Sequence, residues 1–166
     1  NKGCNAGAVA EQAIMLMLML LRHGRTGDLA VREGRQMEVK ERYMESGIRE
    51  LSACRVGLVG FGDIAKATAL RLHAFGCPLY YSKHRRDRQE EEQYGVTYLS
   101  LEELTASSDI VSLHCAVNDE TRGMVNEAFL NRMRRDAYLV NTARWDLVDN
   151  EALRQALLTG HLAGVG

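Results

Sequence analysis

The spacing of apolar residues changes near residue 54, and the change divides the chain into two regions. Before it, the run AIMLMLMLL (13–21) belongs to a longer stretch of strong helix formers, 7–22, which predicts a long apolar N-terminal helix. A second, more polar helical stretch follows through Gly34, and the charged residues 35–53 indicate an irregular surface connector. From Cys54 onward, short apolar runs alternate with helical segments.

The alternation after Cys54 is typical of a parallel sheet whose strands are connected by helices. Strands are expected at 54–60, 78–82, 96–99, 109–115 and 137–143, and helices at 63–75, 87–95, 101–106, 126–133 and 150–160. We predict an α/β fold of the Rossmann type, a doubly wound parallel sheet with helices on both faces. Its core covers 54–166, after the N-terminal helices (1–34) and the connector (35–53).

The composition excludes several classes of protein. A chain of 166 residues with 26% charged residues fits one ordinary soluble domain. A net charge of −1 gives no electrostatic reason to expect nucleic acid or an anionic membrane as a partner, and the apolar run is shorter than the roughly 20 residues that span a bilayer. The cysteines are scattered without a CxxC pair, which predicts reduced thiols in a cytoplasmic protein and no metal site. They are Cys4, Cys54, Cys77 and Cys115.

The segment GFGDIA (60–65) matches the pattern G-x-G-x-x-G/A between a predicted strand and a predicted helix. Gly60 permits the tight turn, Gly62 lets the backbone approach a pyrophosphate, and Ala65 is small enough for the helix to meet the strand. The start of the helix offers free N–H groups to phosphates, provided that the Asp63 carboxylate points away. The pattern predicts a dinucleotide site; a glycine-rich turn that only packs is the alternative.

Polar and basic residues follow the next predicted strand, where such a site contacts the adenosine ribose. An NAD site usually has an acid there, but this chain has SKHRRD (82–87), with no acid before Asp87. The hydroxyl of Ser82 and the cations Lys83 and Arg85 match the 2′-phosphate of NADP through charge-assisted hydrogen bonds. NADP is therefore favoured over NAD, and a solvated run of charges at a helix start is the alternative.

Four stretches together carry a resemblance to a known family. They are AGAVAEQAIMLML (6–18), VGLVGFGDIAKATALRLHAFG (56–76), DIVSLHCAVNDETRGMVNEAFL (109–130) and AYLVNTARWDLVDNEAL (137–153), the last followed by HLAGVG (161–166). In order and spacing they resemble the D-2-hydroxyacid dehydrogenase family, which includes glyoxylate/hydroxypyruvate reductases and phosphoglycerate dehydrogenases. The resemblance spans nearly the whole chain.

The resemblance implies roles for particular residues. Arg144 would bind the carboxylate of a small 2-keto or 2-hydroxy acid and polarise the carbonyl that receives hydride, a role that suits a guanidinium fork at the carboxyl end of a strand. The cofactor would lie along the pyrophosphate turn (Asp63, Ile64), the ribose-binding position (Lys83), the segment beside both riboses (Cys115) and the nicotinamide end (Thr142, Ala143, Arg144). A surface arginine paired with Asp146 or Asp149 is the alternative for Arg144.

Several positions depart from the family's pattern. Ala116 stands where the family usually has proline, Trp145 where it usually has glycine, and Gln36 where a tryptophan is common. We expect Trp145 either to restrict the substrate pocket or to cap it for an apolar substrate. His114 is not expected to donate a proton, because the family's histidine at that place does not.

The resemblance also indicates what this chain lacks. The family's proton-donating histidine and its carboxylate partner follow the segment that corresponds to HLAGVG, and the family's second lobe is absent as well. We expect the cofactor domain of an NAD(P)-dependent enzyme that reduces a small 2-keto acid such as glyoxylate or hydroxypyruvate, inactive alone. A non-catalytic dinucleotide-binding module of the corepressor type and an inactive truncated homologue are the alternatives. The apolar N-terminal helix predicts a homodimer.

Overall fold

The computed structural model describes residues 5–166, in which six parallel strands form one sheet in the order β3-β2-β1-β4-β5-β6. The strands are β1 (Val56–Val59), β2 (Leu79–Ser82), β3 (Thr97–Tyr98), β4 (Ile110–Leu113), β5 (Ala137–Asn141) and β6 (Leu162–Val165). This strand order is that of a Rossmann-type fold, so the predicted α/β class is confirmed. No strand was predicted at β6, because LAGV has only two strongly apolar side chains and a glycine between them.

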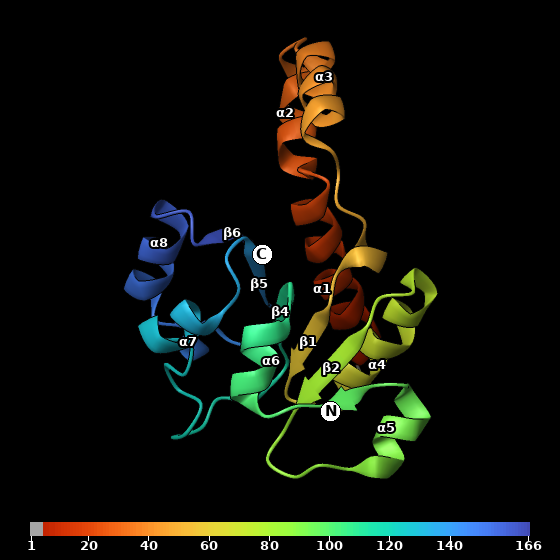
Figure 1. The fold of residues 1–166 in the computed structure, drawn as a ribbon, viewed down its shortest axis with the longest axis vertical. Helices are drawn as coiled ribbons and strands as arrows, with labels where there is room; N and C mark the ends of the chain where they lie inside the picture. The colour runs from red at the N-terminus through yellow and green to blue at the C-terminus, as the bar shows by residue number, and fades with distance from the viewer. Residues whose placement is uncertain (1–4) are drawn as a thin grey trace.

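Helices cover both faces of the sheet (Figure 1). One face carries α1 (Ala6–Leu21), α4 (Asp63–Leu72) and α5 (Arg88–Tyr94), and the other carries α6 (Leu101–Ser107), α7 (Glu127–Arg132) and α8 (Asn150–Leu158). The central strands therefore bury side chains on both sides: Leu58 packs toward the α1 and α4 side, and its neighbour Val59 packs toward the α6 and α7 side. Burial on both faces explains why β1 is continuously apolar.

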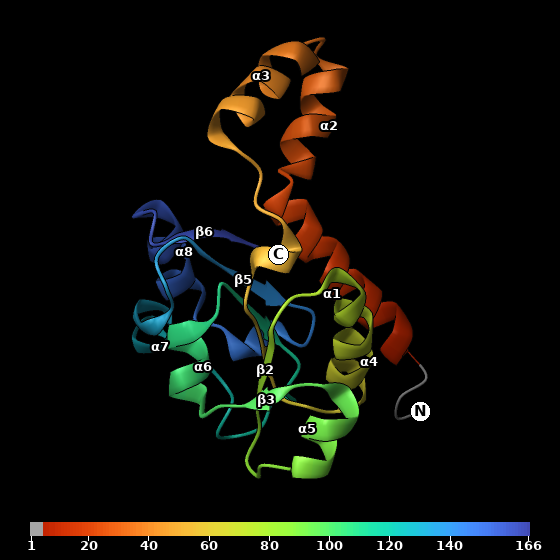
Figure 2. The ribbon, with the colours of Figure 1, turned by 45° about the vertical axis from the view of Figure 1, so that its right-hand side comes forward.

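The N-terminal helices differ in what they contact. In α1, the side chains of Ala10, Ala13 and Met17 are fully buried, and the helix packs along α4. Helices α2 (Gly24–Arg32) and α3 (Gln36–Ser46) pack on each other and extend away from the sheet, as both Figure 1 and Figure 2 show. We call α2 and α3 the arm.

The prediction of an irregular connector over 35–53 is wrong for most of that segment. Residues Gln36–Ser46 form α3, and Leu51–Ala53 form a short 3₁₀ turn. Only Val39 of α3 is buried, so this helix buries no continuous apolar stripe that would have predicted it from the sequence. The helix is stabilised instead by contact with α2 and by an Arg42–Glu38 ion pair of 3.0 Å one turn apart.

A buried carboxylate ties the base of the arm to the amino end of the sheet. Asp109, which directly precedes β4, is 4% exposed and accepts a 2.8 Å hydrogen bond from the backbone N–H of Arg55. Arg49, between the arm and β1, and Arg134, before β5, approach the same carboxylate to 2.9 and 3.2 Å. Burial opposes ionisation of Asp109, but the hydrogen bonds from Arg55 and Arg49 outweigh it and lower its pKa. The charged carboxylate thus joins three segments.

The described residues also bear on membranes, thiols and metals. No single helix in 5–166 is long and apolar enough to cross a bilayer, although α1 and α2, bent by 67°, pass that test as a pair by length and composition alone. Cys54, Cys77 and Cys115 are free thiols, and Cys4 lies outside the described residues. No cluster of possible metal ligands occurs within 5–166.

Candidate functional site

The carboxyl ends of three strands meet at one edge of the sheet, where the strand order reverses direction. β1 lies between β2 and β4, and Val59 at its end is in register with Ser82 on one side and Leu113 on the other. The chain continues from β1 into α4 on one face, and from β4 toward α7 on the opposite face. The loops after β1 and β4 therefore diverge, which creates the crevice where open α/β sheets bind their ligands.

Gly60 occupies a position that no other residue fits. Its φ is +87°, and a Cβ there would lie 2.8 Å from the backbone N and 2.9 Å from the Cα of Cys115. Its N–H donates a 2.8 Å hydrogen bond to the carbonyl of Ser82, so the turn is locked between β2 and the end of β4. Backbone atoms surround the missing side chain, and no change of rotamer would relieve a clash with them.

Gly62, unlike Gly60, has open space where a side chain would begin. It precedes α4 with extended backbone (φ −96°, ψ −166°), and no atom of residues 5–166 lies within 4 Å of where its Cβ would be. No side chain caps the start of α4, whose first residue, Asp63, is exposed. Ala65, one turn into the helix, is completely buried against the sheet. Open space beside uncapped N–H groups fits a pyrophosphate.

One groove, which we call the β2 groove, lies beside the end of β2 and has a volume of about 450 Å³. Its lining includes four residues selected from the sequence, Gly60, Ser82, Lys83 and Cys115. It also includes the apolar side chains of Leu101 and Met124 and the ring of Tyr98. Ser82 is 8% exposed, and the Lys83 side chain is 24% exposed. The groove is mostly apolar, as an adenosine requires, and its charged lining residues are Lys83 and the acids Glu102 and Glu120.

A second groove, which we call the β5 groove, lies beyond the end of β4 and has a volume of about 620 Å³. Its lining includes Ile64, Cys115, Thr142, Ala143 and Arg144. Cys115 lines both grooves, so they adjoin at that residue.

Arg144 is presented by a turn that one side chain holds in shape. The Asn141 side chain accepts a 3.0 Å hydrogen bond from the N–H of Ala143 and donates one of 2.9 Å to the carbonyl of Arg144. The exposed guanidinium of Arg144 donates to the carbonyl of Ala143, and it forms no ion pair with any residue in 5–166. Asp146 is paired with Arg122 at 3.4 Å instead. Most N–H donors of Arg144 are therefore free for a carboxylate.

Two polar atoms in the β5 groove's lining are buried without a hydrogen-bond partner in the part of the chain that the structure describes: Thr142 Oγ1 and His114 Nδ1. Unsatisfied buried polar atoms are rare, and a bound ligand is one way to supply their partners. His114 also shares a 2.9 Å hydrogen bond between its Nε2 and Ser112 Oγ. Burial lowers the pKa of His114 to about 4, so its ring is neutral at pH 7 and is a poor proton donor. Burial likewise raises the pKa of the Cys115 thiol.

Comparison with known proteins decides the family. The sequence pattern described as D-isomer specific 2-hydroxyacid dehydrogenase, NAD binding domain, matches residues 14–166. The chain belongs to this family. A 2-hydroxyacid dehydrogenase of this kind binds NAD(H) through the matched domain, and the open turn at Gly62 and the orphaned Thr142 hydroxyl fit that cofactor.

Relatives of this dehydrogenase domain span several substrates. It is 40% identical to a glyoxylate reductase of Korarchaeum cryptofilum, over 95% of this chain and 47% of that protein. It is 35% identical to a formate dehydrogenase of Chaetomium thermophilum, over 99% of this chain and 44% of that protein. The apo structure of Rhodotorula graminis D-mandelate dehydrogenase superposes with a TM-score of 0.93 at 30% identity, covering 99% of this chain and 49% of that one. The chain spans about half the length of these relatives.

The dehydrogenase domain brings together most of the residues that the sequence analysis selected. Gly60, Ser82, Lys83 and Cys115 share the β2 groove, and Ile64, Thr142, Ala143 and Arg144 line the β5 groove, while Gly62, Asp63 and Ala65 form the turn between them. Arg85 is exposed and is not part of either lining, and Trp145 is 72% exposed outside both grooves.

Sequence reasoning missed two residues of the site. Asn141 was noticed only as part of a strand, although an asparagine at a strand end before a turn is a recognisable signal for side-chain-to-backbone hydrogen bonds. Glu90, which contacts Lys83, gave no such signal, because its segment was predicted only as a helix and nothing in the sequence indicates that it lies beside Lys83.

Proposed function

We propose that this chain is the cofactor domain of an enzyme that reduces a small 2-keto acid, with NADP(H) favoured over NAD(H). The observation that carries the proposal is that two grooves adjoin at Cys115 beside the glycine turn, and that Arg144, which has no ion pair among residues 5–166, lines one of them. The named relatives are reductases and dehydrogenases, which favours an enzyme over a non-catalytic binding module.

Bound nicotinamide would supply hydride to the carbonyl carbon of the substrate. Arg144 would hold the substrate carboxylate through its guanidinium fork and draw electron density from the adjacent carbonyl. Asn141 would orient Arg144 by fixing the turn that carries it. His114 is neutral and bonded to Ser112, so it would be a poor proton donor. The resemblance to the family implies that a histidine following the segment that corresponds to HLAGVG would donate the proton instead.

The preference for NADP(H) is proposed from the end of β2. Lys83 takes the place where an NAD site usually has an acid, and the buried Ser82 hydroxyl lines the same groove. Arg85, two residues later, is exposed, does not line the groove and has no ion pair among residues 5–166, so its guanidinium would be free to turn toward a bound phosphate. These residues would hold the 2′-phosphate by charge-assisted hydrogen bonds.

Titration of the chain with NADPH and NADH tests the proposal. Wild type should bind NADPH more tightly. The double change Lys83→Ala and Arg85→Ala should weaken NADPH binding about 10- to 100-fold or more and NADH binding less than about threefold, since a single charge-assisted hydrogen bond of about 1.5–3 kcal/mol already accounts for about 10- to 100-fold. Arg88→Ala, which removes an exposed cation outside the groove, is the control. Equal or tighter NADH binding would refute the cofactor preference, and failure to bind either would refute the site.

We also propose that the chain forms a homodimer through α1 and the arm. Exposed apolar side chains gather there: Met15, Met19, Leu29, Val31, Met37 and Met44. Met15 and Met19 also line an apolar depression of about 570 Å³ between α1 and Phe75. Apolar surface of this kind is typical of an interface between subunits. Sedimentation at micromolar concentration should show a dimer, and a monomer alone would contradict the proposal.

The free thiols support a cytoplasmic location, which cell fractionation tests.

A further inference from the structure

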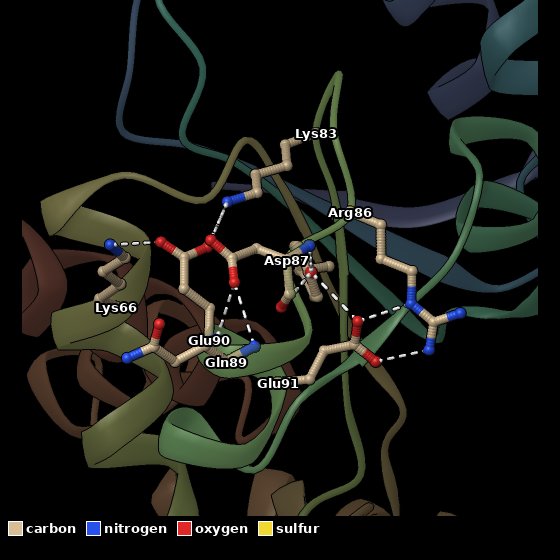
Figure 3. Close-up of polar contacts among 8 residues, drawn as sticks. Lys66, Lys83, Arg86, Asp87, Gln89, Glu90 and Glu91 are labelled. Carbon is tan, nitrogen blue, oxygen red and sulfur yellow. Dashed lines mark hydrogen bonds and ion pairs between the residues drawn. The ribbon is translucent and has the colours of Figure 1, made fainter.

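Glu90, in the first turn of α5, lies between two lysines from different parts of the fold. Lys66, on α4 just after the glycine turn, approaches Glu90 Oε1 to 2.6 Å, and Lys83 Nζ donates a hydrogen bond to Oε2 (Figure 3). The Glu90 side chain is 16% exposed, so solvent screens the cluster only in part. One carboxylate thus connects the helix of the dinucleotide turn with the cation of the β2 groove.

This contact is not explained by capping of α5. A glutamate three residues after an N-cap often bonds back to the N-cap N–H, as Glu103 does with Ser100 at α6. At α5, Asp87 caps the helix with its own carboxylate, and its N–H donates to the Tyr81 hydroxyl instead. The Glu90 carboxylate therefore has only the two lysines as partners among the described residues.

The charges of the cluster balance before any cofactor arrives. Burial opposes ionisation of Glu90, but hydrogen bonds from Lys66 and Lys83 outweigh it and lower its pKa, so the carboxylate is charged at neutral pH. Asp87 adds a second carboxylate 3.9 Å from Lys83 Nζ. The charge of Lys83 is therefore already compensated by Glu90 and Asp87 when a 2′-phosphate enters the β2 groove, and both carboxylates would repel that phosphate.

We propose that Glu90 is a selectivity-determining residue that restrains and neutralises Lys83, and so limits the preference for NADP(H) over NAD(H). The inference rests on the proposed function, because it requires the adenosine ribose to lie in the β2 groove. Glu90 is not among the residues that line that groove, so it acts through Lys83. Its effect should fall on the dianionic 2′-phosphate and hardly at all on a ribose hydroxyl.

Two substitutions should move the selectivity in opposite directions. Glu90→Gln keeps the shape of the side chain and removes its charge, so the affinity for NADPH should rise on the order of tenfold while that for NADH changes less than about twofold. Lys66→Gln leaves Lys83 as the one ammonium bound to Glu90, so the ratio of NADPH to NADH affinity should fall. Because Lys66 lies near the pyrophosphate turn, the ratio is the informative quantity.

Calorimetric titration of the chain and its variants with both cofactors is the experiment. Glu92→Gln is the matched control: it makes the same change on an exposed face of the same helix, and no ion pair of Glu92 occurs within 5–166. Thermal unfolding checks that each variant folds, and Lys66→Gln alone tests the inference if Glu90→Gln does not fold. An unchanged or lowered ratio in Glu90→Gln, or an unchanged or raised one in Lys66→Gln, would overturn it. These outcomes refute only the inference on Glu90, provided that wild type binds both cofactors. If wild type binds neither cofactor, the proposed function itself is refuted.

Discussion

Replacement of Gly60 by alanine should lower the free energy of unfolding by about 2–5 kcal/mol, which combines the strain of a positive φ with the overlap of a new Cβ. The overlap involves the backbone N and Cα of Cys115, at 2.8 and 2.9 Å, so the end of β4 must move to accept the methyl group. Urea unfolding followed by circular dichroism measures the loss. Because Cys115 joins the two grooves, affinity for either cofactor should fall as well.

Gly62→Ala is the matched control for that change. Nothing lies within 4 Å of its Cβ position and its φ is −96°, so the stability should change by less than about 1 kcal/mol. Affinity for NADH and NADPH should nevertheless fall about tenfold or more, because the methyl group occupies space that we assign to the pyrophosphate. A stable Gly60→Ala chain would contradict the backbone contact, and normal cofactor binding by Gly62→Ala would contradict the assignment.

Arg144→Gln should have the largest effect on catalysis. In the enzyme that contains this domain together with the segments that complete its active site, kcat/KM for a 2-keto acid should fall about 10³-fold, or about 4 kcal/mol, because the guanidinium both binds the carboxylate and stabilises charge in the transition state. Arg144→Lys should recover only part of this, since an ammonium keeps the charge and loses the fork. Steady-state kinetics with glyoxylate and with a bulkier 2-keto acid measures both variants.

Cofactor affinity is the internal control for Arg144. The guanidinium lines the β5 groove and, among residues 5–166, is bonded only to the Ala143 carbonyl. Because Arg144 is also expected at the nicotinamide end, NADH and NADPH should bind the variants somewhat less tightly, but the loss of affinity should be much smaller than the fall in kcat/KM. Activity of Arg144→Gln within about fivefold of wild type would show that the arginine has no role in catalysis.

Local sequence patterns were sufficient to predict the strand and the helix on either side of the dinucleotide turn. The strand at Val56–Val59, the glycines after it and the helix from Asp63 follow one another within a few residues, and each depends on neighbours in the chain. The strand β6 and the helix α3 were not predicted, because what stabilises them comes from elsewhere. β6 is completed by pairing with β5, and α3 by packing on α2.

The sequence by itself determined the class of fold, the dinucleotide turn and the arginine at the end of β5, since alternation, glycine spacing and the position of a charged side chain after a strand are properties of contiguous residues. Only the tertiary structure decided which cations are available. The sequence shows Lys83 and Arg85 alike as cations after a strand. In the structure, Lys83 lines the β2 groove and is bound to Glu90, whereas Arg85 is exposed outside that groove. Lys66 and Glu90 belong to different helices, and only the packing of α4 beside α5 brings their charges together. Ion pairs between such distant segments depend on how the helices pack on the sheet, which no local pattern records.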